Sequence, residues 1–192
     1  MLSIILRPLV SASRLGSMSL LAGLAVARVA EATTGRQATV KWPNDVLIDG
    51  HKVAGILLQT RPAGGQSSGY LNLGIGINVG STPATCTADA TSFSETAGAS
   101  VTVLDVLHRL IAELDSVYRA FLAGDLADAW AEVNDRLAFR DQEVTIEDGD
   151  RTIRGIVAGI GDGGELLLRR PDGTIRAVVS GELVRGPRPT LT

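Results

Sequence analysis

The chain has 192 residues, of which 45% are hydrophobic and 20% are charged, an ordinary composition for a soluble globular protein with a sizeable core. Its formal net charge is −3 at pH 7 and no stretch is dense in Lys or Arg, which argues against a nucleic-acid-binding surface. Cys86 is the only cysteine, so an internal disulfide and a cysteine-based zinc site are excluded. We therefore expect a reducing, cytoplasmic location.

The N-terminal part predicts a strand followed by a helix. Residues 2–6 (LSIIL) form a short apolar run ended by Arg7-Pro8, which is typical of a buried strand. Apolar side chains at helical spacing predict a helix over residues 17–31, ended by Thr34-Gly35. Its run at residues 20–27 imitates a signal-peptide core, but it lacks a basic start and is too short to cross a bilayer. We interpret the run as a buried helix and expect no membrane association.

The middle of the chain predicts strands, a loop and two helices. The strand-like segments are residues 38–42, 46–48, 53–59 and 70–79. Residues 82–100 are rich in Ala, Thr and Ser and are expected to form a loop. Thr102 and Asp105 predict the N-terminal cap of a helix, and a second helix is expected over residues 126–136. The apolar stripe expected on the first helix consists of Leu104, Leu107, Ile111, Leu114, Tyr118 and Phe121.

The pattern changes from Gln142 on. Short alternating runs are separated by three Asp-Gly turns, at Asp148-Gly149, Asp162-Gly163 and Asp172-Gly173. Short strands with regularly spaced turns predict a small antiparallel β-barrel. The expected fold is therefore α+β, a mixed or antiparallel sheet with helices in residues 1–138 and the barrel in residues 139–192. The domain boundary should fall near residues 138–141.

The stretch KWPNDVLIDGHKVAGIL, residues 41–57, carries the first candidate site. Asp49-Gly50 predicts a two-residue hairpin turn, which would pair Ile48 with His51 and Asp45 with Ala54. Asp45 and Lys52 would then share one face as diagonal neighbours, roughly 7–8 Å apart. Geometry alone leaves two interpretations, a cross-strand ion pair on a solvated face or two groups that contact one ligand.

The stretch YLNLGIGINV, residues 70–79, carries the second. Its odd positions are all large and apolar and must face the core, whereas Gly74 and Gly76 share the other face with Asn72 and Asn78. Glycine weakens a strand interior unless something approaches the backbone closely. A flat ligand or a tightly packed helix would explain the two glycines. The motif is no dinucleotide fingerprint, because it lies inside a strand and lacks a third glycine before a helix.

Taken in order, KWPNDV, HKVAGIL and GIGINV resemble the catalytic core of biotin protein ligases, and GIVAGIGDGGELLL with VSGEL resembles the final domain of that family. The resemblance covers essentially the whole chain from Leu2 on. It implies a catalytic domain of the class II synthetase, or biotinyl/lipoyl ligase, type and a C-terminal SH3-like β-barrel that helps to order the nucleotide and receives the acceptor.

The resemblance implies a two-step acyl transfer. ATP activates biotin to biotinyl-5′-AMP, and a lysine of the biotin carboxyl carrier domain of a carboxylase then takes the biotinyl group. Lys52 would polarise the reacting oxygens, and Asp45 would help the incoming amine to lose its proton. Nucleotide or Mg²⁺ contacts are implied for Lys41, Asn44 and Asn78, and contacts with the bound ligand for Trp42, Gly55, Gly74 and Gly76. Mg²⁺ would bridge the phosphates, no protein metal ligand is assigned, and a homodimer is possible in this family.

Upstream features of the family are missing from this sequence. Arg7, Arg14 and Arg36 lie in no G-R-G-R context, and neither the Ser/Thr-rich biotin segment nor DNA-binding helices precede the first strand. We therefore expect an N-terminally truncated ligase with little or no turnover on its own. Two alternatives stay open, a lipoate- or octanoate-transferring relative and a non-catalytic remnant that binds carrier domains or nucleotide. The W-P-N-D turn and the C-terminal barrel favour the biotin ligase over lipoate transfer.

Overall fold

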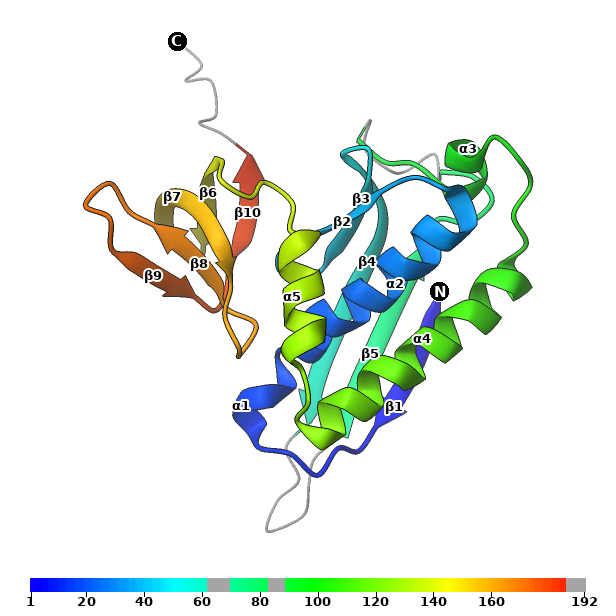
Figure 1. Ribbon diagram of the computed structural model, residues 1–192, viewed down its shortest axis with the longest axis horizontal. Helices are drawn as coiled ribbons and strands as arrows, with labels where there is room; N and C mark the ends of the chain where they lie inside the picture. Colours follow the sequence, from blue (N-terminus) through cyan, green and yellow to red (C-terminus); the bar gives the residue numbers. More distant parts are fainter. Residues whose placement is uncertain (62–69, 83–88, 186–192) are drawn as a thin grey trace.

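The computed structural model describes residues 1–61, 70–82 and 89–185; Cys86 and its predicted loop position lie outside them. Two five-stranded antiparallel sheets form the framework (Figure 1). The first has the order β1-β5-β4-β3-β2, built from β1 (Leu2–Leu6), β2 (Ala38–Lys41), β3 (Asp45–Ile48), β4 (His51–Arg61) and β5 (Tyr70–Ile77). The second has the order β10-β6-β7-β8-β9, built from β6 (Glu143–Asp148), β7 (Arg151–Ile160), β8 (Leu166–Arg169), β9 (Ile175–Val178) and β10 (Glu182–Arg185). The predicted α+β class is confirmed.

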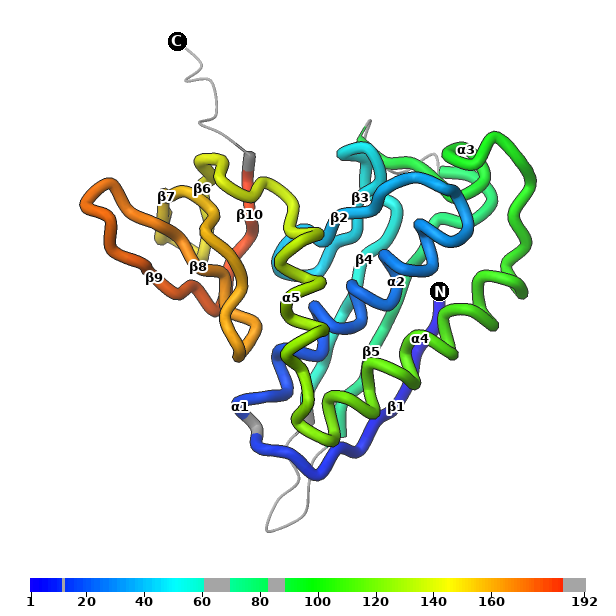
Figure 2. Tube along the Cα trace, viewed as in Figure 1, coloured from blue at the N-terminus to red at the C-terminus, as the bar shows by residue number. Residues whose placement is uncertain are grey.

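The helices gather on one face of the first sheet. They are α1 (Ala12–Leu15), α2 (Met18–Thr34), α3 (Phe93–Ala97), α4 (Val103–Ala123) and α5 (Ala127–Asp135). Helices α2 and α4 lie side by side across that face, and α5 lies between α2 and the second sheet (Figures 1 and 2). The opposite face of the first sheet is therefore left without a helix among the described residues.

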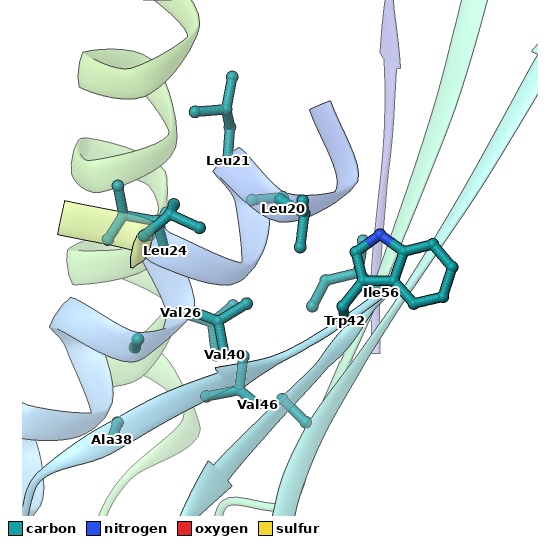
Figure 3. Close-up of a cluster of buried hydrophobic side chains, with 14 of the residues drawn as sticks. Leu20, Leu21, Leu24, Val26, Ala38, Val40, Trp42, Val46 and Ile56 are labelled. Carbon is teal, nitrogen blue, oxygen red and sulfur yellow. The ribbon is translucent and has the colours of Figure 1, made fainter. Parts of the chain in front are cut away.

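Helix α2 is the centre of the core, as predicted for its apolar run. Leu21, Leu24 and Val26 are fully buried, and burial of a leucine contributes about 1.5–3 kcal/mol. Gly23 faces Val40 of the sheet, which Figure 3 labels, and a Cβ at Gly23 would lie 3.4 Å from a Val40 methyl, an ordinary van der Waals contact. Residues 13–34 have the length and composition of a membrane span, yet 67% of the apolar window is buried inside the protein. Burial against the sheet explains its apolar character.

Helix α4 buries a different stripe from the predicted one. Its buried residues are Val106, Leu110, Leu114, Val117 and Phe121. Leu104 and Ile111 are instead 65% and 51% exposed, so their assignment to the core was wrong. The helix carries two neighbouring apolar stripes, and contact with α2 decides which one turns inward. The predicted cap is confirmed, because the Thr102 side chain accepts a hydrogen bond from the Asp105 N–H at 3.2 Å.

Two local predictions need correction. Strand β1 is an edge strand paired only with β5, and Ile5 is 65% exposed, so the prediction of a buried strand was wrong. Alternate side chains of β1 point to the uncovered face of the sheet. The expected loop over residues 82–100 contains the short helix α3, capped by Ser92, whose hydroxyl accepts from the Glu95 N–H. The Ala-, Thr- and Ser-rich composition predicted a loop and gave no sign of this short helix.

The C-terminal sheet has its own core, which includes Ile146, Val157 and Leu168. The first hairpin turn consists of Gly149-Asp150, one residue later than predicted, because Asp148 pairs with Arg151. Strand β10, which the alternating runs did not predict, completes the sheet beside β6. Residues 136–142 connect α5 to β6. The domain boundary and the closure of the sheet into a barrel stay predictions.

Ion pairs hold α5 to the helical layer. The Arg28 guanidinium on α2 contacts both Glu132 on α5 and Glu113 on α4. Arg136 contacts Glu31 at 2.8 Å and Glu132 at 3.0 Å. The hydrogen bond from Arg28 lowers the pKa of the Glu132 carboxyl and raises that of the guanidinium. These ion pairs hold α5, the last helix before the second sheet, against α2 and α4.

Candidate active site

The β3–β4 hairpin places the two candidate catalytic side chains. The predicted turn is confirmed, with Asp49 and Gly50 at φ values of 52° and 84°. Leu47 pairs with Lys52 as expected, but a bulge follows, and Asp45 lies opposite Gly55 instead of Ala54. The predicted pairing of Asp45 with Ala54 was therefore wrong. The extra residue on β4 is Val53, and the bulge re-aims the side chains beyond it.

Lys52 and Asp45 form an ion pair above a glycine. The Lys52 Nζ lies 2.5 Å from the Asp45 Oδ1, and the side chains are 49% and 16% exposed. A Cβ at Gly55 would lie 3.4 Å from the Lys52 Nζ and 3.5 Å from the Asp45 Oδ1. The cross-strand ion pair, which was one of the two interpretations of this hairpin, is present in the protein without ligand. Gly55 leaves room for it to lie close to the sheet.

The backbone of Lys52 is held on its other edge. Its N–H donates to the Asp89 carbonyl at 2.7 Å, and its carbonyl accepts from the Thr91 N–H at 2.9 Å. The Asn78 side chain donates to the Thr91 carbonyl at 3.0 Å. It thereby holds residues 89–91, which in turn hold the Lys52 backbone. Asn78 is thus engaged with the protein through its amide NH₂ group, and it is not part of the cleft described below.

The bend between β2 and β3 brings Lys41 and Asn44 to the same place. The Trp42–Pro43 peptide bond is cis. The Asn44 side chain donates to the Ile56 carbonyl at 2.9 Å, and the Asn44 carbonyl accepts from the Ile56 N–H at 2.8 Å. Asn44 therefore ties the bend to β4. Trp42 is only 2% exposed, so little of its surface is available for the ligand contact that the resemblance implies.

A cleft of about 340 Å³ joins these residues to the second sheet. It is lined on one side by residues 41–45 and Lys52, and on the other by Gly181, Glu182 and Leu183. Sequence reasoning singled out no residue of the second wall, although VSGEL carried part of the resemblance. Glu182 is an exposed carboxylate across from two lysines. The cleft thus presents both signs of charge.

A row of side chains and glycines crosses the uncovered face of the first sheet. Lys41 pairs with Asp45, Asp45 with Gly55, and Gly55 with Gly76, so the four positions lie on one face of four adjacent strands. Strands are about 4.8 Å apart, so the row spans roughly 14 Å. A ligand along it would meet charged groups at one end and bare backbone at the other.

Gly74 and Gly76 lie on this open face. Among the described residues, the nearest atoms to a Cβ at Gly74 would belong to Leu57, at 3.6–3.7 Å, and a Cβ at Gly76 would meet only the Gly55 carbonyl, at 3.9 Å. No helix packs on them, so packing by a neighbouring helix does not explain the glycines. Leu57, paired with Gly74 and 61% exposed, adds an apolar side chain that sequence reasoning missed.

The described residues offer no metal site of their own, since no group of three or more His, Cys, Asp or Glu side chains comes together in them. Mg²⁺ usually binds through one or two carboxylates together with substrate phosphates. Asp45 is the carboxylate on the lysine side of the cleft, and the Lys52 ammonium already pairs with it.

Comparison with known proteins agrees with this geometry. The profile of the biotin/lipoate A/B protein ligase family matches residues 1–78, and that of the biotin protein ligase C-terminal domain matches residues 141–186. A biotin–[acetyl-CoA-carboxylase] ligase of Paracoccus denitrificans is 30% identical over 186 residues, covering 89% of this chain and 74% of that protein. The chain therefore belongs to the biotin protein ligase family.

Particular relatives show how much of a family member is present. The bifunctional ligase/repressor BirA of Bacillus subtilis is 29% identical over 192 residues, which cover 96% of this chain and 58% of that protein. The chain thus spans little more than half the length of that relative. The biotin protein ligase of Aquifex aeolicus in complex with biotin and ATP superposes with a TM-score of 0.81 at 26% identity, covering 96% of this chain and 77% of that one.

Proposed function

We propose that this chain activates biotin with ATP to biotinyl-5′-AMP and transfers the biotinyl group to a lysine of a biotin carboxyl carrier domain. The observation that carries the proposal is the Lys52–Asp45 ion pair. It lies above Gly55, the first of the three glycines on the open face (Gly55, Gly74 and Gly76, here called the glycine floor), and it lines the cleft that holds charges of both signs. The structural relative from Aquifex aeolicus, which holds biotin and ATP, supports the choice of ligands.

In the first step a biotin carboxylate oxygen attacks the α-phosphorus of ATP. A new O–P bond forms, the bond to the bridging oxygen of the β-phosphate breaks, and pyrophosphate leaves. Negative charge builds up on the oxygens around the α-phosphorus, where the Lys52 ammonium is the fixed cation that stabilises it. Lys41 lies in the same cross-strand row and the same cleft, and its charge suits the departing phosphates. Mg²⁺, when bound, neutralises phosphate charge.

The glycine floor suits the acyl part of the adenylate. Gly55, Gly74 and Gly76 leave the backbone open, and Leu57 offers apolar contact beside them. The roughly 14 Å row is long enough for an extended acyl chain that ends at the charged groups. A side chain at any of the three glycines would occupy the space in which the chain lies.

In the second step the carrier lysine amine attacks the acyl carbon of the mixed anhydride. An amide bond forms, the bond from the acyl carbon to the phosphate oxygen breaks, and AMP leaves. The amine must lose a proton, and the Asp45 carboxylate at the cleft is the nearby group that can accept it. Residues 181–183 line the same cleft, so the second sheet would lie next to the carrier domain while its lysine reacts.

The remaining parts of the proposal concern partners and place. A net charge of −3 without a dense basic run supports a protein acceptor over nucleic acid, and a single cysteine supports a cytoplasmic location. A second copy of the chain as partner stays a prediction, which size-exclusion chromatography with light scattering tests.

Two assays on the whole chain test the function. Biotin-dependent exchange of radioactive pyrophosphate into ATP reports the first step, and labelling of a carrier domain reports the second. We expect both to require biotin and Mg²⁺. Exchange that runs with lipoate or octanoate instead of biotin would contradict the assigned acid. Because little or no turnover is expected of the chain alone, both assays are also run on the chain joined to the N-terminal segment of a relative. A folded, extended chain with neither reaction would overturn the function.

A further inference from the structure

Trp42 lies inside the candidate active-site segment and lines the cleft, yet its side chain is almost fully buried. It follows Lys41 and precedes Pro43 and Asn44, yet its residue surface is 2% exposed. Its indole N–H donates to the Gly164 carbonyl at 3.1 Å, on the turn between β7 and β8 (Figure 3 draws the indole nitrogen in blue). The segment that carries the candidate site therefore makes a direct hydrogen bond to the second sheet.

Gly164 is shaped for this contact. Its φ is +87°, a conformation that side chains rarely adopt, and a Cβ there would lie 3.1 Å from the Ser17 Cα. Its N–H donates to the Gly161 carbonyl at 2.9 Å, which closes the turn. The turn thus packs against the start of α2 while its carbonyl faces the indole.

The same segment is held at both of its ends. Before it, the Val40 N–H donates to the Arg136 carbonyl at 2.8 Å, and the Val40 carbonyl accepts from the Ala138 N–H at 2.9 Å. After Trp42, the Pro43 carbonyl accepts from the Ser19 hydroxyl at 3.3 Å. The Trp42 contact is the link among these that reaches the second sheet itself, whose residues 181–183 form the opposite wall of the cleft.

We propose that Trp42 is a positioning residue: its hydrogen bond to Gly164 sets the second sheet against residues 41–45 and so fixes the width of the cleft between Lys41 and Glu182. The inference rests on the proposed function for its catalytic consequence, and on the geometry alone for the positioning. Trp42 acts through its neighbours, because its side chain is almost fully buried and its indole N–H is bound to the Gly164 carbonyl.

Asn134 provides the matched control. Its side chain also joins the first layer to the second sheet, since its Oδ1 accepts from the Ile160 N–H at 2.8 Å and its amide donates to the Ile160 carbonyl at 3.3 Å. It makes no recorded hydrogen bond to residues 41–45. Loss of Asn134 therefore weakens docking of the sheet without touching the candidate site directly.

Hydrogen–deuterium exchange of the whole chain tests the positioning. Trp42→Phe removes the donor and keeps an aromatic ring, and we expect exchange at residues 41–45 and 181–183 to rise at least about tenfold, or about 1.4 kcal/mol in opening free energy. Asn134→Ala should raise exchange near residues 158–161 only. Unchanged exchange at residues 41–45 in Trp42→Phe, or an equal rise there in Asn134→Ala, would overturn the proposal.

Steady-state pyrophosphate exchange separates positioning from simple destabilisation. We expect Trp42→Phe to raise KM for ATP at least about fivefold, or about 1 kcal/mol, while kcat changes less than twofold. Asn134→Ala should leave KM within twofold, and a KM for Trp42→Phe within twofold of the wild type would contradict the catalytic part. These rates are measured in a chain joined to the N-terminal segment of a relative. An extended wild-type chain without exchange activity would contradict the proposed function, while hydrogen exchange would still decide whether Trp42 positions the second sheet.

A measurement on the unaltered protein covers the case in which Trp42→Phe does not fold. The chain has two tryptophans, so the indole N–H of Trp42 can be followed by NMR beside that of Trp130. We expect the Trp42 indole N–H and the backbone amides of residues 41–45 to exchange through one opening, with the same dependence on denaturant. An indole N–H that opens independently of those amides would contradict the proposal.

Discussion

Asp45 and Lys52 approach to 2.5 Å although they are not paired across the strands, because the bulge at Val53 brings Asp45 opposite Gly55. The Lys52 side chain is 49% exposed, whereas that of Asp45 is 16% exposed, so a phosphate can reach the Lys52 ammonium from solvent while Asp45 stays in place. The pair holds both groups in place until a ligand takes over Lys52.

In a chain extended by the N-terminal segment of a relative, Lys52→Ala should lower the rate of adenylate formation at least about tenfold, or about 1.4 kcal/mol, because it removes the cation next to the reacting phosphate. His51→Ala is the matched control, since His51 is the exposed neighbour at the hairpin turn and its partner is Ile48. It should change the rate less than twofold. Pyrophosphate exchange measures both, and a Lys52→Ala rate within twofold of the wild type would remove Lys52 from the mechanism.

Gly76→Ala should weaken biotin binding without unfolding the protein. A Cβ at this position meets only the Gly55 carbonyl, at 3.9 Å, so the free energy of unfolding should change by less than about 0.5 kcal/mol. The methyl would project onto the open face, and biotin affinity measured by calorimetry should fall at least about tenfold, or 1.4 kcal/mol.

Gly16→Ala is the control for Gly76→Ala. Gly16 has nothing within 4 Å of a Cβ and lies between α1 and α2, away from the open face. It should leave both stability and biotin affinity unchanged. Loss of more than about 2 kcal/mol of stability in Gly76→Ala would show that the glycine serves packing instead of ligand access.

Local signals in the sequence predicted the elements, and long-range contacts decided their details. Asp49-Gly50 predicted its turn because both positions tolerate positive φ. The register beyond it depended on Val53, which is fully buried and whose carbonyl accepts from the Asn78 N–H. A two-residue turn carries no information on such a bulge.

In the candidate site, too, the sequence predicted the local part and missed the long-range contacts. One cleft is lined by four residues that the motifs singled out, Lys41, Asn44, Asp45 and Lys52. The opposite wall comes from residues more than a hundred positions later, and the partner of Trp42 is Gly164. Neither contact leaves a periodic signal near the motif, so only the folded chain could show that the Trp42 indole N–H binds the second sheet.

A chain that ends after Ala138 tests whether the second sheet is separable, as predicted from sequence. It keeps the contacts of Arg136 and Ala138 with Val40 but loses the acceptor of the Trp42 indole N–H. We expect retained far-UV circular dichroism from the helices and a red-shifted emission of Trp42. The Trp130→Phe background isolates that emission, since the chain has two tryptophans. A shortened chain that is unfolded by circular dichroism would contradict separability.

The last prediction concerns stability and pH, and it depends on the Arg28–Glu132 ion pair. The hydrogen bond from Arg28 lowers the pKa of the Glu132 carboxyl from its usual value of 4.5. Because the folded-state pKa lies below the unfolded one, the stabilisation is fully present above about pH 4.5 and is lost as pH falls through the folded-state value. Glu132→Gln should therefore cost about 1–3 kcal/mol at pH 7.

The difference in free energy of unfolding between Glu132→Gln and the wild type should shrink as the pH is lowered from 5 toward about 3, because protonation then removes the same charge from the wild type. Urea unfolding at each pH measures it. Asp115→Asn is the control, since Asp115 and Arg119 form an exposed pair within α4 and its loss should cost less than about 1 kcal/mol at any pH. A Glu132→Gln cost that stays constant down to pH 3 would show that packing of the side chain, and not its charge, holds α5 against α2.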